Sequence, residues 1–315
     1  MNKYIFLSGV ACLGLSLPSI AGEMVDKSVS AERIQSLSVE NIRGQVDIIA
    51  HNEQSISIKG ELDDETERFV FEPSGRNMEI RVELPQNHRG KWEGDGSNLT
   101  IKVPKHIRIA FQGVSSDFSL SGFEERVDGR TVSGNIVAKD LAKKVELESV
   151  SGDVTTENLS GKLQLATVSG DIKDKHSQGR MKLKTVSGDI QTQSTATEVA
   201  ISAVSGAIDF DLDKVDELAI KSVSGSISGQ SHLNNGGRIK IGAVSSNIDL
   251  ALQENLSAAF KVSASAGGHI VNELTDHKPH KAKYGPSSKL KFTTGNADSA
   301  VKIGVVSGKV TLRNK

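Results

Sequence analysis

A Val-Ser-Gly tripeptide, or a close variant of it, recurs along this 315-residue chain at a constant spacing. Six copies follow one another eighteen positions apart, beginning at Val114, Val132, Val150, Val168, Val186 and Val204. The series continues at Val223 and Val244 with slightly longer spacings and at Val262 with the original spacing, and it returns once more at Val306. A fixed period of this length is the signature of a repeat architecture, in which each short unit stacks on the next.

Each unit carries apolar residues at alternate positions. In the unit that begins at Val150, these are Val154 at the fifth position and Leu163 and Leu165 at the fourteenth and sixteenth. A period of two predicts half-buried strands and not helices. The eighteenth position is small in successive units, where it is occupied by Thr131, Ser149, Thr167, Thr185 and Ala203.

The alternation shifts where one unit meets the next. If positions fourteen, sixteen and eighteen face the core, the Val that follows should face outward, yet this residue is always apolar. We expect a corner or bulge before the Val that turns it back into the core, with the Gly permitting the backbone to bend. Each unit is then two short strands on either side of this corner, closed by a polar turn such as residues 156–158.

The sequence therefore predicts an all-β protein, a single-stranded β-helix-like solenoid with 18-residue coils. Thirty glycines and only 4% aromatic residues suit such a thin repetitive body. An antiparallel meander with Ser-Gly hairpin turns has the same spacing and is the alternative; in-register stacking better explains why one residue type recurs at one position. The expected parts are a signal peptide (1–21), an N-terminal β cap or irregular first coils (22–111), the regular repeat (112–268), a loop insertion (269–290) and a C-terminal coil or cap (291–315).

Residues 1–21 have the pattern of an export signal. Lys3 precedes an apolar stretch, and small residues up to Ala21 form a cleavage signature. The only cysteine, Cys12, lies inside this segment, in a context that makes a poor lipoprotein signal. No later stretch is long and apolar enough to predict a transmembrane helix. We therefore expect a mature chain in the periplasm or cell envelope, with the outer surface as a further option.

The net charge of −1 gives no basic excess of the kind that nucleic-acid binding requires, so no nucleic-acid partner is expected. Enzyme motifs are also missing: the chain contains no Gly-x-Ser-x-Gly, P-loop, dinucleotide or His-Glu-x-x-His pattern. The repeated serines have no histidine at matching periodicity to activate them. We expect a protein without catalytic activity or cofactor.

The export signal, the early segment "IRGQVDI", the strand pair "LTIKVPKHIRIAF" and the serial "VSGDI" units together resemble an adhesin family of bacterial exported proteins with a VSGD-repeat β domain of unknown function. The resemblance covers roughly Ser36 to Leu312. It implies a β-solenoid fold and a cell-envelope location, and it brings no catalytic motif. Later units depart from the pattern, with Ala207, Ser226 and Asn247 in place of Asp.

The recurring aspartates are weak candidates for a metal site. Asp153, Asp171 and Asp189 would form a carboxylate ladder one coil apart, and Ca²⁺ takes oxygen ligands of this kind. Aspartate also suits turns, because its side chain hydrogen-bonds the local backbone. Since Ala207 and Ser226 occupy the same position later in the chain, we favour the turn interpretation.

Three further groups are considered for binding. His277 and His280 have a loose metal-ligand spacing in a basic loop, but neighbouring ligands are lacking. Trp92 could stack on a sugar ring or pack beneath its own loop. The acidic run at 207–217 could hold a cation or form the solvated side of a strand.

These observations predict a non-enzymatic, adhesin-like or scaffolding solenoid that binds an unidentified envelope polymer or protein through a repeated polar face, with weak contacts adding by avidity. One alternative is a polysaccharide lyase or hydrolase on a β-helix scaffold. Another is an envelope assembly or stress accessory that binds another protein.

Overall fold

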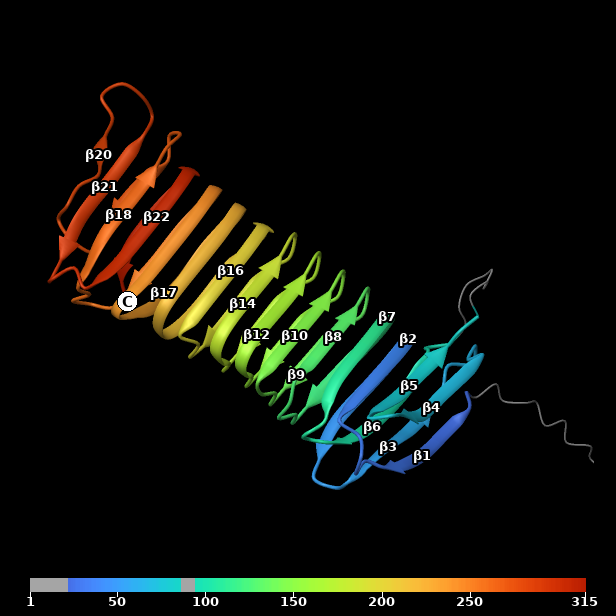
Figure 1. The fold of residues 1–315 in the computed structure, drawn as a ribbon. Helices are drawn as coiled ribbons and strands as arrows, with labels where there is room; N and C mark the ends of the chain where they lie inside the picture. Colours follow the sequence, from blue (N-terminus) through green and yellow to red (C-terminus); the bar gives the residue numbers. More distant parts are fainter. Residues whose placement is uncertain (1–21, 86–93) are drawn as a thin grey trace, which may run out of the picture.

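The computed structural model of the chain describes residues 22–85 and 94–315; the expected signal peptide and Trp92 lie outside the described residues. Every regular element in the described ranges is a β-strand, and the strands stack side by side into one elongated body (Figure 1). The all-β solenoid predicted from the repeat is confirmed.

The regular coils each contribute two strands. The first ladder consists of β8 (Val127–Thr131), β10 (Lys144–Ser149), β12 (Ser160–Thr167), β14 (Gln178–Thr185) and β16 (Glu198–Ser205). The second consists of β9 (Ile136–Lys139), β11 (Val154–Glu157), β13 (Ile172–Lys175) and β15 (Ile190–Ser194). Both ladders are parallel, and the paired residues occupy equivalent positions of successive repeats, as in Leu147 with Leu165 and Val154 with Ile172. The parallel register rules out the antiparallel meander for these coils.

The core lies between the two ladders and is filled by the alternate apolar residues. Val145, Leu163, Met181 and Val199 stand one above another on consecutive coils and are almost completely buried. Burying one aliphatic side chain stabilises a fold by about 1.5–3 kcal/mol, so a coil gains most of its stability only when its neighbours cover it. The repeat period therefore follows from the need to stack.

The valine of each corner faces outward, so the expectation that it turns into the core is wrong. Exposed fractions are 43–47% for Val114, Val132, Val150, Val168, Val204, Val223, Val244 and Val306. The simple alternation continues through the corner: Ser149 and Ala203 are buried, and the valine after each is exposed. Where the buried residue carries a hydroxyl group, that group also closes the turn. The Ser149 Oγ accepts a hydrogen bond from the Gly152 N–H at 2.9 Å and donates one to the Gly134 carbonyl at 3.0 Å.

The corner glycine is required by the spacing between coils. A Cβ atom on Gly152 would lie 1.8 Å from the carbonyl oxygen of Gly134, and one on Gly170 would lie 2.1 Å from that of Gly152. Real Cβ atoms do not approach a backbone oxygen so closely. These glycines do not have the positive φ that turns often demand, so close approach and not bending explains the residue.

The N-terminal strands form an irregular first coil with antiparallel additions. They are β1 (Met24–Ser30), β2 (Ser36–His51), β3 (Ser55–Glu61), β4 (Arg68–Ser74), β5 (Asn77–Glu83), β6 (Ser97–Pro104) and β7 (Arg108–Ser121). Strand β2 runs round a corner and pairs in parallel with β7, joining residues far apart in sequence, such as Val39 and Phe111. On its other side β2 pairs with β5 and β6, while β1, β3 and β4 add antiparallel pairings at this end.

At the C-terminal end the order of strands in space departs from the order in sequence. The elements are β17 (Ile208–Leu252), β18 (Ala258–Ala264), β19 (His269–Asn272), β20 (His280–Lys281), β21 (Ser288–Thr294), β22 (Ser299–Ser307) and β23 (Lys309–Asn314). Strand β22 lies between β17 and β18, where Val301 pairs with both Ile239 and Phe260 (Figure 1). Strand β21 then pairs antiparallel with the far side of β18. The last coil of the chain is thus inserted before the coil that precedes it in sequence.

This insertion corrects one member of the repeat series. Val262 is buried and pairs with Ile303, which precedes the corner valine Val306 on the same strand. Val262 is therefore not a corner valine, although it follows Val244 at the spacing of the repeat. The coil stacked on that of Val244 is the coil of Val306, in which Ser245 pairs with Ser307.

Candidate binding surfaces

The corner aspartates hold adjacent coils together. Each carboxylate oxygen accepts a hydrogen bond from the backbone N–H of the equivalent residue in the next coil: Asp153 from Asp171 at 2.8 Å, Asp171 from Asp189 at 2.8 Å, and Asp189 from Ala207 at 2.7 Å. Asn135 accepts the same bond from Asp153 at 2.9 Å, so an amide oxygen serves equally well. Only the residue that accepts the bond needs a side-chain oxygen. The last residue of such a ladder donates only its backbone N–H, so it can be Ala or Lys.

The exposed corner valines form a continuous ladder along one edge of the solenoid. Their backbones are linked, since the N–H of Ser151 donates to the Val132 carbonyl and the N–H of Ser169 donates to the Val150 carbonyl, both at 2.8 Å. A shallow groove of about 490 Å³ follows the ladder beside Val132, Val150 and Val168. The serine after each valine adds a hydroxyl at every coil, and it is exposed in most coils and half-buried at Ser224 and Ser307. This surface, called the corner ladder below, repeats one apolar and one polar group per coil.

The outer face of the first ladder of strands carries mixed charges in the coils nearer the N-terminus. Ion pairs join Arg130 to Glu148 at 3.4 Å, Lys144 to Glu146 at 3.0 Å and Arg180 to Glu198 at 2.7 Å. Exposed pairs of this kind contribute little stability, on the order of 0–1 kcal/mol each. They neutralise these side chains in pairs, while Lys182 and Lys184 on β14 make no ion pair within the described ranges.

A buried carboxylate interrupts the apolar core of the second ladder. Asp174 accepts hydrogen bonds from the hydroxyls of Thr156 at 2.7 Å, Thr192 at 3.0 Å and Ser177. Thr156 and Thr192 are its register partners on the neighbouring coils. Burial raises the pKa of Asp174 above its usual value, although the three hydroxyl donors act in the opposite direction. The group is enclosed and satisfied by its neighbours, which indicates a structural role.

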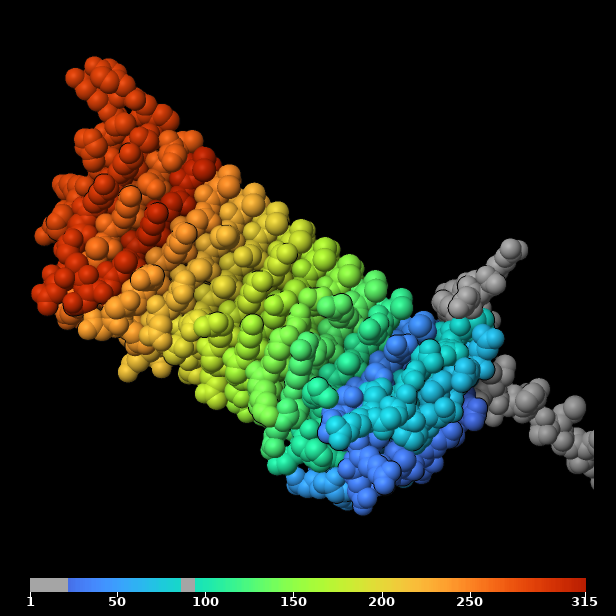
Figure 2. Space-filling model, viewed as in Figure 1, coloured from blue at the N-terminus to red at the C-terminus, as the bar shows by residue number. Residues whose placement is uncertain are grey.

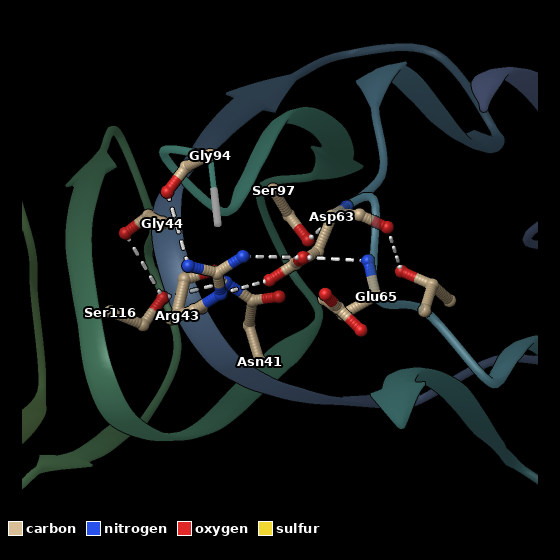
Figure 3. Close-up of polar contacts among 9 residues, drawn as sticks. Asn41, Arg43, Gly44, Asp63, Glu65, Gly94, Ser97 and Ser116 are labelled. Atoms are coloured by element: carbon tan, nitrogen blue, oxygen red, sulfur yellow. Dashed lines mark hydrogen bonds and ion pairs between the residues drawn. The ribbon is translucent and has the colours of Figure 1, made fainter. Parts of the chain in front are cut away.

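A second polar cluster joins the N-terminal strands to one another (Figure 3). The Arg43 guanidinium makes a two-pronged contact with the buried Asp63 carboxylate, with Nη2 at 2.8 Å from Oδ1, and this hydrogen bond raises the pKa of Arg43. Asn41 donates to the Arg43 carbonyl at 2.8 Å and to the Ser116 hydroxyl at 2.7 Å. Ser97 accepts the Asp63 N–H at 3.1 Å. The cluster ties β2 to β6 and β7.

The two loop histidines are placed differently from each other. The ring of His277 stacks on Phe292 with centroids 5.3 Å apart, and its Nδ1 lies 3.1 Å from the Thr275 hydroxyl. His280 is exposed in β20, where its backbone pairs with Lys289. The aspartates of the acidic run point outward between the buried residues Ile208, Phe210 and Leu212 of one strand.

Across residues 22–85 and 94–315, no three side chains of His, Cys, Asp or Glu are grouped closely enough to form a metal site. The same ranges contain no helix that is long and apolar enough to span a bilayer. The metal and sugar-binding roles considered for Asp153, Asp171, Asp189, His277, His280 and Trp92 stay predictions.

Stacked parallel coils, buried in-register side chains and corner ladders define this protein as a β-solenoid repeat protein. Residues 34–313 match the sequence profile of the family described as Toastrack DUF4097, and the chain belongs to this family. No match was found among curated proteins. Among solved structures, the chain is similar to a "putative cell adhesion protein" from Clostridium sporogenes ATCC 15579, with 10% identity, 93% of this chain and 100% of that chain covered, and a TM-score of 0.24.

Sequence reasoning missed two surfaces. The outward direction of the corner valines could have been found from the strict alternation, which already placed them on the outer face. A row of lysines at the C-terminal end carries no signal in the sequence, because its members belong to strands that are not neighbours along the chain.

Proposed function

We propose that this protein is an exported, non-enzymatic, adhesin-like or scaffolding component of the bacterial cell envelope that binds an envelope polymer or partner protein along the corner ladder. The observation that carries the proposal is the repetition of an outward valine and an outward serine from coil to coil, with most of these side chains exposed. A ligand with its own repeat would meet these groups many times, so that weak contacts add. Rigid stacking keeps the groups aligned before binding, which reduces the loss of conformational entropy on binding.

The family membership supports a solenoid scaffold and leaves its ligand open. The envelope location rests on the export signal predicted at residues 1–21. An enzymatic solenoid would need a nucleophile or an acid–base pair at a cleft, and the charged and hydroxyl groups described above are instead engaged with the backbone or with each other.

The proposal is tested with the purified chain from residue 22 onward and isolated envelope fractions. We expect the protein to sediment with the insoluble fraction, and a variant with V132N, V150N and V168N to bind at least about tenfold more weakly while it keeps its thermal stability. Because these side chains point outward, the variant should fold.

A matched control carries V137N, T155N and Q191N, three outward substitutions on β9, β11 and β15, and should bind as the wild type does. Equal binding by both variants would refute the corner ladder as the contact surface. Release of reducing or unsaturated sugar ends from the envelope fraction would instead show an enzyme. Protection of the protein from protease in intact cells, with cleavage after the outer membrane is opened, would restrict it to the periplasm.

A further inference from the structure

Four lysines stand in one row across the C-terminal end of the solenoid. Lys240 on β17 pairs with Lys302 on β22, Lys302 with Lys261 on β18, and Lys261 with Lys291 on β21. All four side chains are exposed. Adjacent strands are about 4.8 Å apart, so the row spans roughly 14 Å in single file. Figures 1 and 2 show these strands side by side on one face of the molecule.

The charge of this lysine row is not compensated locally. Within the described part of the chain, none of the four lysines forms an ion pair with a carboxylate. The outward residues on either side of the row are neutral or basic; they are Ala259, Ser263, Ala300, Gly304, Gly242, Thr293, Arg238 and Lys289. This contrasts with the paired charges of the earlier coils, where Lys144 and Arg180 each contact a glutamate.

Like charges placed directly opposite on neighbouring strands destabilise a sheet. Four consecutive lysines therefore impose a repulsion that the fold does not relieve with its own carboxylates. A polymer that supplies negative charge along the row would remove this repulsion and gain favourable contacts at the same time. The unrelieved repulsion is the observation that points to a ligand.

The geometry points to an acidic polysaccharide, a linear polymer with a carboxylate on each sugar, as the ligand of the lysine row. A single file of charges on a rigid strand ladder suits an extended chain. Lysine is a compact point charge that suits isolated carboxylates, whereas planar two-pronged recognition favours arginine. Single-stranded nucleic acid is bound with aromatic stacking platforms, and no outward position beside the row is aromatic.

The lysine row is separate from the corner ladder. Lys240 and Val244 lie on the same strand at different outward positions, and they differ in chemistry. The inference therefore does not depend on the ligand of the corner ladder. Either proposal can be refuted by experiment without affecting the other.

The test uses polygalacturonate as the probe, dextran as the neutral control and the chain from residue 22 onward. The row variant combines K240Q, K261Q, K291Q and K302Q. A matched control combines K102Q, K173Q, K175Q and K214Q, which remove the same charge from exposed lysines outside the row that also make no ion pair. Immobilised polymer and a biosensor give the affinities.

We expect the wild type to bind polygalacturonate and not dextran, with affinity that falls as salt is raised. The row variant should bind about 30-fold more weakly, the effect of losing four exposed ion pairs together, while the control changes by no more than about threefold. The row variant should melt no lower than the wild type, because it relieves repulsion.

Three results would overturn the inference. The first is no binding of polygalacturonate by the wild type, and the second is unchanged binding by the row variant. The third is an equal loss of affinity in the two variants, which would mean that net charge alone determines binding. Single-stranded DNA and phosphatidylglycerol vesicles are measured in parallel. If either binds more tightly than polygalacturonate through the same four lysines, the polysaccharide assignment is wrong.

Discussion

The carboxylate of Asp171 accepts a hydrogen bond from the backbone N–H of Asp189, its equivalent one coil later, at 2.8 Å. The same bond recurs from coil to coil and explains why the repeat favours Asp or Asn after the glycine. The main role of these aspartates is therefore structural, because each one links its coil to the next by a hydrogen bond.

Replacing the three ladder aspartates tests this role. The combined variant D153N, D171N and D189N should melt within about 2 °C of the wild type, because an amide oxygen accepts the same bond, as Asn135 does. Asp171→Ala, which loses the acceptor, should cost about 1 kcal/mol of unfolding free energy. Melts are recorded with and without Ca²⁺. A rise in the wild-type melting temperature with Ca²⁺ that the combined variant lacks would establish a metal ladder.

Gly152→Ala should be strongly destabilising, by about 3 kcal/mol or more, because the new Cβ would lie 1.8 Å from the Gly134 carbonyl oxygen. Gly242→Ala is the matched control, since nothing lies within 4 Å of a Cβ at that position. Urea unfolding of both variants gives the comparison. Similar, small changes for the two would mean that neighbouring coils can move apart at the corner.

Val150 and Val154 test the direction of the corner valine. Val150→Ala should change the unfolding free energy by less than about 0.5 kcal/mol, as expected of an exposed site. Val154→Ala should cost about 2 kcal/mol, because it opens a cavity in the core. Equal losses in chemical denaturation would place the Val150 side chain inside.

Asp174 should make stability depend on pH in an unusual direction. Its pKa in the folded state is raised by burial above the ordinary 3.8, so the folded protein binds a proton more tightly than the unfolded chain. The contribution of this pKa difference to the unfolding free energy is fully present at pH values below the pKa of Asp174 in the unfolded chain. It is lost as pH rises through the pKa of Asp174 in the folded state. Asp174→Asn removes this loss while its amide still contacts Thr156 and Thr192.

The measurement is the unfolding free energy of the wild type and Asp174→Asn at several values between pH 3 and pH 7. We expect the unfolding free energy of the variant to rise relative to that of the wild type as pH rises through the pKa of Asp174 in the folded state. Other carboxylates contribute equally to both proteins and cancel in the difference. A difference that stays constant, or that falls with pH, would show that the carboxylate is not held at a raised pKa.

Much of the fold could be predicted because it depends on near neighbours. The spacing of Val132, Val150 and Val168 specified the coil length, and the alternation around Val154 specified strands with one buried side. The candidate surfaces were harder to predict. The apolarity of the corner valine predicts a place in the core, whereas the alternation of buried and exposed residues continues through the corner, with Ser149 buried and Val150 exposed.

The sequence by itself determined the strand period and the coil length, since both follow from contacts that recur in every regular coil. The structure decided between the parallel register and the antiparallel alternative, and it showed that close approach between coils is the reason for a glycine such as Gly152. Only the tertiary structure decided the order of the last coils. Strand hydrogen bonds are the same for any partner of suitable length, so local pattern does not specify whether β18 or β22 stacks on β17. Packing placed β22 there, and this placement brought Lys240, Lys302, Lys261 and Lys291 into one row.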